Sequence, residues 1–180
     1  MAGMKATRAT GIKGGSEILY AIGATSLGSV LVARSTGGVC AILLGDDSQG
    51  VIRDLRAQFV GAKLLDDKSG MTETVAAAVA SVEHPERPFD PPLDIGGTEF
   101  QRKVWRALRE IPPGTTTSYS EVARNIGSPK SLRAVAGACA ANVLAIAIPC
   151  HRVLRSNGSL SGYRWGMERK RILLEREKTL

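Results

Sequence analysis

A cysteine followed directly by a histidine carries the strongest chemical signal in the sequence. Cys150 and His151 stand at the end of a fully apolar run, residues 143–148, and a cation, Arg152, follows them. A free thiol is mostly un-ionised near neutral pH, so a nucleophilic cysteine needs a base or a cation nearby. Adjacent residues on an extended chain point apart, so we expect His151 to reach the thiol through a water molecule. Cys150 is therefore the candidate nucleophile, and a structural role as a small buried hydrophobe is the alternative.

The other cysteines and the other histidine give no comparable signal. Cys40 and Cys139 suit buried structural positions, and His84 lies in a proline-rich stretch. Three cysteines and two histidines at these spacings provide no zinc site, so we expect no bound metal. The cysteines are also too few and too scattered for a disulfide scaffold, which predicts a reducing compartment and a cytoplasmic protein.

Length and composition exclude several classes of protein. The chain has 180 residues, of which 43% are hydrophobic and 23% charged, as is typical of one or two small globular domains. Its longest uncharged run, residues 134–150, contains Gly137, Asn142 and Pro149 and is shorter than the ~20 apolar residues of a membrane span. No apolar stretch near Met1 resembles a signal peptide. We expect no contact with a membrane.

Charge is divided unevenly along the chain. Residues 1–90 carry 9 Lys/Arg against 10 Asp/Glu, whereas residues 91–180 carry 15 against 7. A neutral half followed by a basic half is expected of a protein that binds a polyanion with its basic half. A solvated basic surface is the alternative interpretation of the charge alone.

The sequence of the first half predicts a small domain built around a β-sheet. Residues 1–15 contain no acidic residue and four glycines, which indicates a flexible tail. Three short apolar runs separated by glycine- and serine-rich turns predict an antiparallel meander within residues 16–90. Two helical patterns follow, from Val51 to Phe59 and from Thr72 to Val82. Four prolines within residues 84–92 then predict an extended linker, and it coincides with the change in charge.

The sequence of the second half, residues 91–180, predicts a mainly helical structure. Thr98 with Gln101 and Ser118 with Glu121 form two capping boxes, each of which predicts the start of a helix. The second of these helices, a Gly-Ser-Pro break and a third helix over about residues 130–140 have the outline of a helix-turn-helix, although many helical hairpins bind nothing. A last helix is expected from Met167 to Glu177.

Motifs in both halves resemble the O6-alkylguanine-DNA alkyltransferases. The most specific is Pro149-Cys150-His151-Arg152-Val153. Others are Gly97-Thr98-x-Phe100-Gln101-x-x-Val104-Trp105, Ile111-Pro112-x-Gly114, Ser118-Tyr119, Ile126-Gly127-x-Pro129, Arg133-Ala134-Val135, Ser161-Gly162-Tyr163 and Lys170-x-x-Leu173-Leu174-x-x-Glu177. Residues 39–47 are similar to the transferase half of the bacterial adaptive-response Ada proteins. The resemblance covers about residues 18–177.

The resemblance implies a fold, an activity and a partner. The fold would be α/β, with a small ribonuclease-H-like antiparallel sheet domain before a mainly helical domain that holds a helix-turn-helix and a buried Pro-Cys-His-Arg active site. Members repair double-stranded DNA by direct reversal: they bind the minor groove as monomers and flip out the alkylated guanine, because a stacked base is out of reach. The alkyl group then passes once and irreversibly to cysteine, without a cofactor. O4-alkylthymine would be a second substrate.

The resemblance also assigns catalytic roles residue by residue. Cys150 would accept the alkyl group, and His151 would deprotonate it through a water molecule. Glu177 would orient the imidazole. Tyr119 would donate a proton to the ring nitrogen of the leaving guanine. Asn142 would be the hinge between the recognition helix and the active-site strand.

Further residues would bind the substrate. Arg133 matches the arginine that enters the space left by the flipped base. The backbone carbonyls of Cys150 and Val153 would accept the guanine amino group, and Tyr163 and Arg164 would form the pocket wall.

Two positions depart from the family pattern. Val143 stands where a proline often follows the hinge asparagine, which reduces the expected rigidity of that turn. Trp165 stands where other members have a small residue, so the pocket should favour methyl over bulky groups; packing of Trp165 against the last helix is the alternative. The cysteine-rich zinc site of the Ada regulatory half has no match among the three cysteines of this chain.

Two other functions compete with alkyl transfer. A binding module would mark alkylated bases without accepting the group, but the presence of Cys150 with His151 and Glu177 favours transfer. A cysteine hydrolase would need an oxyanion hole and turnover, and it would leave the helix-turn-helix without a role.

Overall fold

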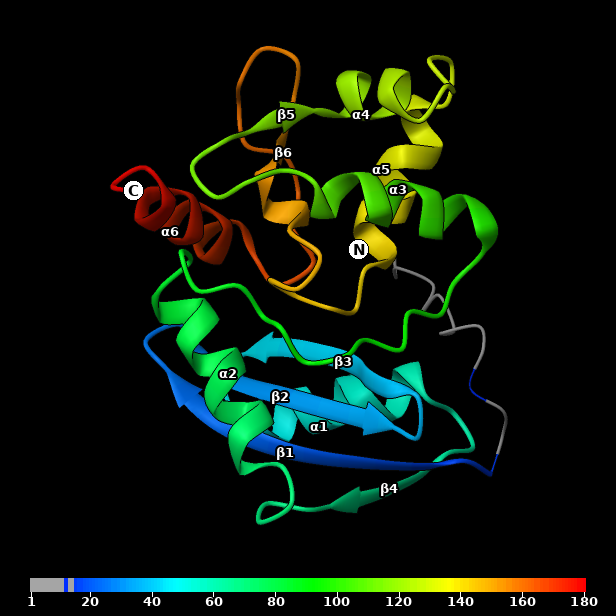
Figure 1. Ribbon diagram of the computed structural model, residues 1–180, viewed down its shortest axis with the longest axis vertical. Coiled ribbons are helices and arrows are strands. Elements are labelled where there is room, and N and C mark those ends of the chain that lie inside the picture. Colours follow the sequence, from blue (N-terminus) through cyan, green and yellow to red (C-terminus); the bar gives the residue numbers. More distant parts are fainter. Residues whose placement is uncertain (1–11, 13–14) are drawn as a thin grey trace.

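A four-stranded mixed sheet forms the first half of the molecule (Figure 1). The computed structural model describes residue 12 and residues 15–180, so most of the expected tail lies outside the described residues. Strands β1 (Glu17–Thr25), β2 (Gly28–Ser35) and β3 (Gly38–Gly45) form the predicted antiparallel meander. Strand β4 (Lys63–Asp66) pairs in parallel with the other edge of β1, and the order is β3-β2-β1-β4. The sequence predicted an antiparallel sheet and missed the parallel edge strand β4, because β4 has only two apolar residues and gives no alternating pattern.

Two helices cover the sheet. Helix α1 (Ser48–Gln58) contacts β2 and β3, and α2 (Thr72–Glu83) contacts β1 and β2. Figure 1 shows α2 in front of the strands and α1 behind them. Residues 30–33 of the central strand are fully buried, as expected of a strand covered on both faces. Both helices agree with the helical patterns of the sequence.

The second half contains four α-helices within the described residues. They are α3 (Glu99–Arg109), α4 (Tyr119–Asn125), α5 (Leu132–Ala141) and α6 (Met167–Glu177). Both predicted capping boxes are present, with Thr98 Oγ1 accepting from the amide of Gln101 and Ser118 Oγ accepting from the amide of Glu121. The Trp105 indole donates to the carbonyl oxygen of Ala138 at 2.8 Å, which fixes α3 against α5. A pair of two-residue parallel strands, β5 (Thr117–Ser118) and β6 (Val153–Leu154), joins the start of α4 to the chain that follows the cysteine.

The segment before Cys150 differs from the sequence expectation of an active-site strand. Residues 143–149 form a turn with a single bridge to the sheet, and Cys150 opens a short 3-10 helix, η1 (Cys150–Arg152). Ile146 has a φ of 65°, which is rare and costly for a β-branched residue. The strand was an expectation from the family resemblance, whereas the apolar run by itself matches a buried strand as well as a buried turn.

The free edge of β3 joins the two halves. Val39 donates its amide to the carbonyl of Pro92, and Ile42 donates to the carbonyl of Val143, both at 2.8 Å. Ile42 also accepts from the amide of Ala145 at 3.0 Å. An edge strand presents unpaired backbone groups, and here the chain entering α3 and the chain leaving α5 satisfy several of them. The boundary near residue 90 between two domains stays a prediction.

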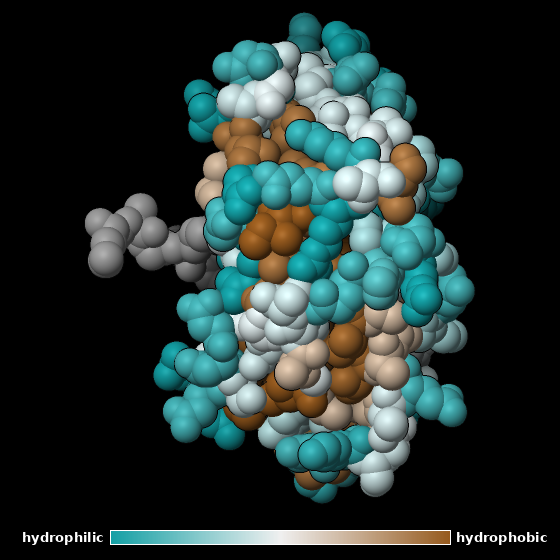
Figure 2. All heavy atoms as spheres, turned by 90° about the vertical axis from the view of Figure 1, so that its left-hand side faces the viewer, coloured by the Kyte–Doolittle hydropathy of each residue, from teal (hydrophilic) through white to brown (hydrophobic). Residues whose placement is uncertain are grey.

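Helix α6 also reaches the first half through polar contacts. Arg169 Nε donates to the carbonyl of Leu27 at 2.8 Å, and Arg176 Nη1 donates to the carbonyl of Val82 at 2.7 Å. The face of the molecule that includes α6 and α2 is mostly hydrophilic, with apolar side chains visible chiefly in recesses (Figure 2). No helix in the described part of the chain has the length and hydropathy to cross a membrane.

Candidate active site

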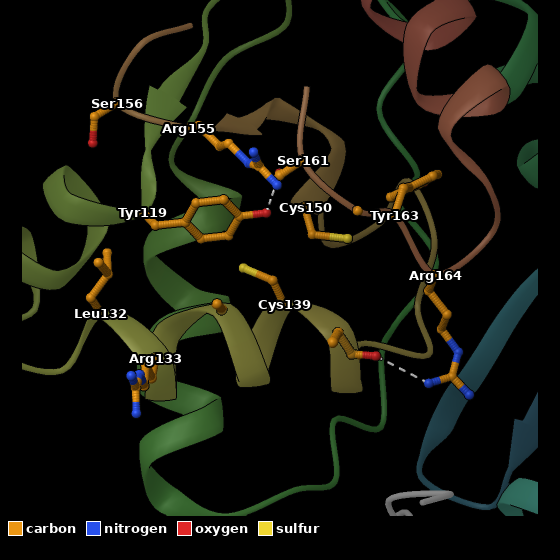
Figure 3. Close-up of a pocket in the computed structure, with 13 residues that line it drawn as sticks. Tyr119, Leu132, Arg133, Cys139, Cys150, Arg155, Ser156, Ser161, Tyr163 and Arg164 are labelled. Carbon is orange, nitrogen blue, oxygen red and sulfur yellow. Dashed lines mark hydrogen bonds between the residues drawn. The ribbon is translucent and has the colours of Figure 1, made fainter. Parts of the chain in front are cut away.

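A pocket of about 580 Å³ lies between α4, α5, η1 and the loop that precedes α6 (Figure 3). Cys150 lies at its base, and Tyr119 and Tyr163 lie on either side. The side chains and backbone that line it come from Tyr119, Leu132, Arg133, Ala136, Cys139, Ala140, Cys150, Arg155, Ser156, Ser161, Gly162, Tyr163 and Arg164. The structure therefore brings together five of the predicted site residues, from segments far apart in the sequence.

The Cys150 thiol is buried and held in place. Its residue is 4% exposed, and its amide donates to the carbonyl of Ile148 at 2.8 Å. Burial raises the pKa of the thiol, although the hydrogen bond from Asn142 and the charge of Lys170 act in the opposite direction. The resting group is therefore a neutral thiol, and it needs a base to become a nucleophile.

Asn142 organises the chain before the nucleophile. Its Nδ2 donates to the carbonyl of Ile148 at 2.9 Å and to Cys150 Sγ at 3.3 Å, while its Oδ1 accepts from the amide of Leu144 at 2.8 Å. Asn142 ends α5 and is 1% exposed. One side chain thus ties the end of α5, the turn and the sulfur atom together.

His151 pairs with Glu177 in the interior. His151 Nε2 lies 2.8 Å from Glu177 Oε1, and both side chains are at most 2% exposed. Burial raises the pKa of Glu177, but hydrogen bonds from His151 and Arg152 outweigh it and hold the pKa at about 2. Burial also lowers the pKa of His151, so the imidazole is neutral near pH 7 despite the neighbouring carboxylate.

The charge of Glu177 fixes the tautomer of His151. An ionised carboxylate only accepts hydrogen bonds, so Nε2 carries the proton and donates it to Glu177. Nδ1 then keeps a free lone pair, and it is buried without a hydrogen-bond partner in the described part of the protein. Nδ1 is therefore the atom of His151 that can accept a proton.

Arg152 is a site residue that the sequence reasoning did not assign. Its Nε and Nη2 donate to the Glu177 carboxylate at 2.9–3.1 Å, and its Nη1 donates to the carbonyl of Ile111. Arg152 thus holds Glu177 ionised and connects α6 to the end of α3. Its place beside His151 in the motif was the available signal.

Tyr119 belongs to a second polar chain, which includes two further residues that the sequence reasoning left without a role. Tyr119 Oη lies 2.5 Å from Ser161 Oγ, and Lys170 Nζ donates to Ser161 Oγ at 3.1 Å. Lys170 Nζ also donates to the carbonyl of Val153 at 2.7 Å. Of the two lone pairs of that carbonyl, one is therefore already used.

The expected pocket walls are arranged around Tyr163. Tyr163 is partly buried, its buried hydroxyl has no partner in the described part of the protein, and its ring contacts those of His151 and Trp165 edge to face. Trp165 is 5% exposed and lies 5.2 Å from Tyr163 between ring centroids, outside the set of lining residues. Arg164 Nη1 donates to the carbonyl of Ala140 at 3.2 Å. Arg133 on α5 is directed away from Cys150 (Figure 3).

The described residues contain no cluster of side chains that could bind a metal ion. None of their His, Cys, Asp and Glu side chains form a group of three or more that could hold an ion. The fold and the pocket instead define an α/β protein whose site is equipped for nucleophilic chemistry at a cysteine.

Comparison with known proteins identifies the family. The family model for the 6-O-methylguanine DNA methyltransferase DNA binding domain matches residues 99–179. The inducible methylated-DNA–protein-cysteine methyltransferase of Bacillus subtilis is 43% identical over 123 residues, which cover 68% of this chain and 69% of that protein. The chain belongs to the methylated-DNA–protein-cysteine methyltransferase family.

Longer relatives and solved structures agree with this assignment. The bifunctional transcriptional activator/DNA repair enzyme Ada of Escherichia coli is 51% identical over 160 residues, 89% of this chain and 45% of its own length. The regulatory protein ada of Salmonella typhimurium is 46% identical, and the match spans 47% of it, so the chain spans about half the length of these two relatives. A Mycobacterium tuberculosis OGT structure in complex with DNA is 34% identical with a TM-score of 0.71, and the match covers 89% of this chain and 93% of that one.

Proposed function

We propose that this protein repairs double-stranded DNA by transferring the alkyl group of O6-alkylguanine irreversibly to Cys150. The observation that carries the proposal is a buried thiol at the base of a pocket, next to a neutral imidazole held by an ionised carboxylate. The family membership supports the same chemistry. The flipped base would occupy the pocket, since an alkylated oxygen inside a stacked duplex cannot meet a buried sulfur.

The proposed reaction begins with proton transfer. His151 Nδ1 takes the thiol proton through a water molecule, and Glu177 stabilises the imidazolium that forms. The thiolate attacks the alkyl carbon in line with the carbon–oxygen bond, whose electron pair leaves with the guanine. Tyr119 donates a proton to the guanine ring nitrogen, which spares the leaving group a negative charge. The thioether has no hydrolytic exit, so each molecule acts once.

DNA would be bound through the basic half of the chain. Helices α4 and α5, joined by residues 126–131, form the proposed helix-turn-helix, and α5 would enter the minor groove. Arg133 is exposed on α5 at the rim of the pocket, where it could fill the space that the base vacates. The carbonyls of Cys150 and Val153 would accept the guanine amino group; the Val153 oxygen would use its second lone pair.

Other features of the proposal follow the family resemblance. Tyr163 and Arg164 would flank the flipped base. Trp165 would limit the size of the alkyl group that the pocket accepts, through its contact with Tyr163. O4-alkylthymine would be a second substrate, and the protein would act as a monomer in the cytoplasm. A module that only binds alkylated bases has no use for a buried base in the residue next to the thiol, so the His151–Glu177 pair favours transfer.

Mass spectrometry after incubation with a duplex containing O6-methylguanine tests the proposal. We expect one adduct on Cys150 of about 14 Da, a methyl group in place of a proton. Cys150→Ala should abolish transfer and keep DNA binding, because phosphate contacts dominate affinity for DNA. An adduct on Cys139 or Cys40 in that variant would refute Cys150 as the acceptor, and tight binding without any adduct on the unaltered protein would identify a marker module.

A further inference from the structure

Three hydrogen-bonded groups lead from the pocket into the core, and the proposed function uses only the first. Tyr119 Oη lies 2.5 Å from Ser161 Oγ, which lies 3.1 Å from Lys170 Nζ. Ser161 is 7% exposed and Lys170 is fully buried. A buried ammonium is costly unless it is paired, and here it donates to a carbonyl and a hydroxyl, both neutral.

The hydrogen bonds of this chain allow every donor to be directed toward the pocket. Lys170 has only protons to give, so Ser161 Oγ accepts from it. The hydroxyl proton of Ser161 is then free to be donated to Tyr119 Oη, a contact in which either oxygen can be the donor. With Ser161 as the donor, Tyr119 keeps its own proton for a group in the pocket. The relay uses this order of donation: Lys170, Ser161, Tyr119 and then the ligand.

Lys170 is also coupled to the nucleophile by charge. Burial lowers the pKa of Lys170, whereas Cys150 and Cys139 raise it. The positive charge of Lys170 in turn lowers the pKa of Cys150. Thiolate and ammonium thus stabilise each other, and alkylation of Cys150 removes the negative charge. Lys170 then becomes a stronger acid at the moment when the departing guanine needs a proton.

We propose, building on the proposed function, that Lys170 supplies the proton of the departing guanine through Ser161 and Tyr119. The sulfur–carbon bond forms and the carbon–oxygen bond breaks, with its electron pair left on the guanine. Tyr119 gives its proton to the ring nitrogen, Ser161 gives one to Tyr119, and Lys170 gives one to Ser161. A thiolate and an ammonium become a thioether and an amine, so the charge balances.

The relay predicts a pH dependence that belongs to Lys170. The titratable groups that affect Lys170 or are joined to it are Cys150 and His151 on η1, Cys139 on α5 and Tyr119 on α4. The relay needs the ammonium form, so the rate of methyl transfer in the preformed DNA complex should fall as the pH rises through the pKa of Lys170. Because burial lowers that pKa, the fall should begin below the ordinary lysine range.

Ser161→Ala tests the relay without removing either end. We expect a loss of about 10²-fold in the single-turnover rate on duplex O6-methylguanine, the usual contribution of a proton donor, with unchanged duplex affinity. The alkaline fall assigned to Lys170 should disappear. With a 3-deaza analogue, which has C–H in place of the ring nitrogen, Ser161→Ala and the unaltered protein should react at the same rate. Equal losses on both substrates, or no loss on either, would overturn the relay.

Further variants separate the relay from fold and from the proposed function. Ser159 lies in the same loop, and its hydroxyl donates to Asn157 Oδ1 at 2.7 Å, outside the relay, so Ser159→Ala should change none of these rates. Ser161→Thr should restore the rate, and Ser161→Cys, a weak donor of similar size, should not. An adduct on Cys150 of the unaltered protein, together with full activity of Ser161→Ala and Ser161→Cys, would refute the relay alone. Absence of that adduct would refute the proposed function.

Discussion

Glu177 shows at the scale of one residue how burial and partners compete. The carboxylate is 2% exposed, which alone would raise its pKa, yet His151 and Arg152 hold it ionised with a pKa of about 2. The same charge sets the tautomer of His151 and leaves Nδ1 free as a base. The acid–base chemistry of the site therefore depends on a residue that does not line the pocket around Cys150.

Replacing Glu177 by Gln should change both stability and reactivity. Its pKa is lower in the folded than in the unfolded state, so the ionised carboxylate stabilises the protein above about pH 4.5, and this contribution is lost as the pH falls toward 2. In Glu177→Gln the free energy of unfolding should depend on pH less steeply in that window, by up to about 1.4 kcal/mol per pH unit. Urea unfolding at a series of pH values measures this.

The reactivity of the same variant tests the role of the His151–Glu177 pair. Without the carboxylate the imidazolium is less stable, so the pH–rate profile of methyl transfer should move to higher pH. Glu175→Gln, an exposed carboxylate on the same helix, is the matched control and should leave the profile unchanged. Superimposable profiles for all three proteins would count against the pair as the activating base.

Helix α6 serves two purposes at the scale of the element. Lys170 and Glu177 lie about two turns apart and contact the site, while Arg169 and Arg176, each one residue earlier, contact the first half. Arg176 also pairs with Glu83 at the end of α2. The first half of the chain thus holds the helix that supplies the buried charges of the site.

Arg176→Ala should therefore lower both stability and activity. The guanidinium donates to the carbonyl of Val82 in a partly buried contact, and loss of a charged hydrogen bond of this kind costs about 1.5–3 kcal/mol before the discount for its partial exposure. Arg171→Ala removes an exposed arginine that binds only carboxylates of its own helix in the described contacts, and it should change little. Equal unfolding curves for the two variants would contradict the anchoring role of Arg176.

The whole molecule places a sheet layer beside a basic helical half, joined at the edge of β3. The pocket opens among α4, α5 and the loop before α6, which all belong to the basic half. Under the proposed function, the basic half makes the DNA contacts and performs the chemistry. The sheet half holds it in place through the edge of β3 and through Arg169 and Arg176 of α6. Arg133, exposed at the pocket rim, is the residue that would fill the space left in the duplex when the base flips into the pocket.

Arg133→Ala should discriminate between substrates that do and do not require flipping. Filling the space left by the base is worth on the order of a few kcal/mol, so repair of duplex O6-methylguanine should slow strongly. Reaction with the free base O6-methylguanine should change little, because no stack is opened. Rates on the two substrates, measured side by side, decide the matter, and equal losses on both would assign Arg133 to another task.

The sequence by itself determined the elements whose causes are local. The meander, the two capping boxes that start α3 and α4 and the last helix depend on spacings of a few residues, and the structure confirms them. The Pro-Cys-His-Arg motif, with the longer resemblance, likewise pointed to the family. The spacing of residues close together in the chain is a property of the sequence itself, so these elements can be predicted without knowledge of the tertiary structure.

Only the tertiary structure decided how distant groups meet. Tyr119 and Ser161 are 42 residues apart, and Arg152 and Glu177 are 25 apart, yet each pair is within hydrogen-bonding distance. The short strand β4 and the turn before Cys150 also depend on neighbours elsewhere in the chain: the edge of β1 for the first, and Ile42 on β3 for the second. Burial and pKa arise from the whole packing around a group, which is why the charge of Glu177 and the buried position of Lys170 required the folded molecule.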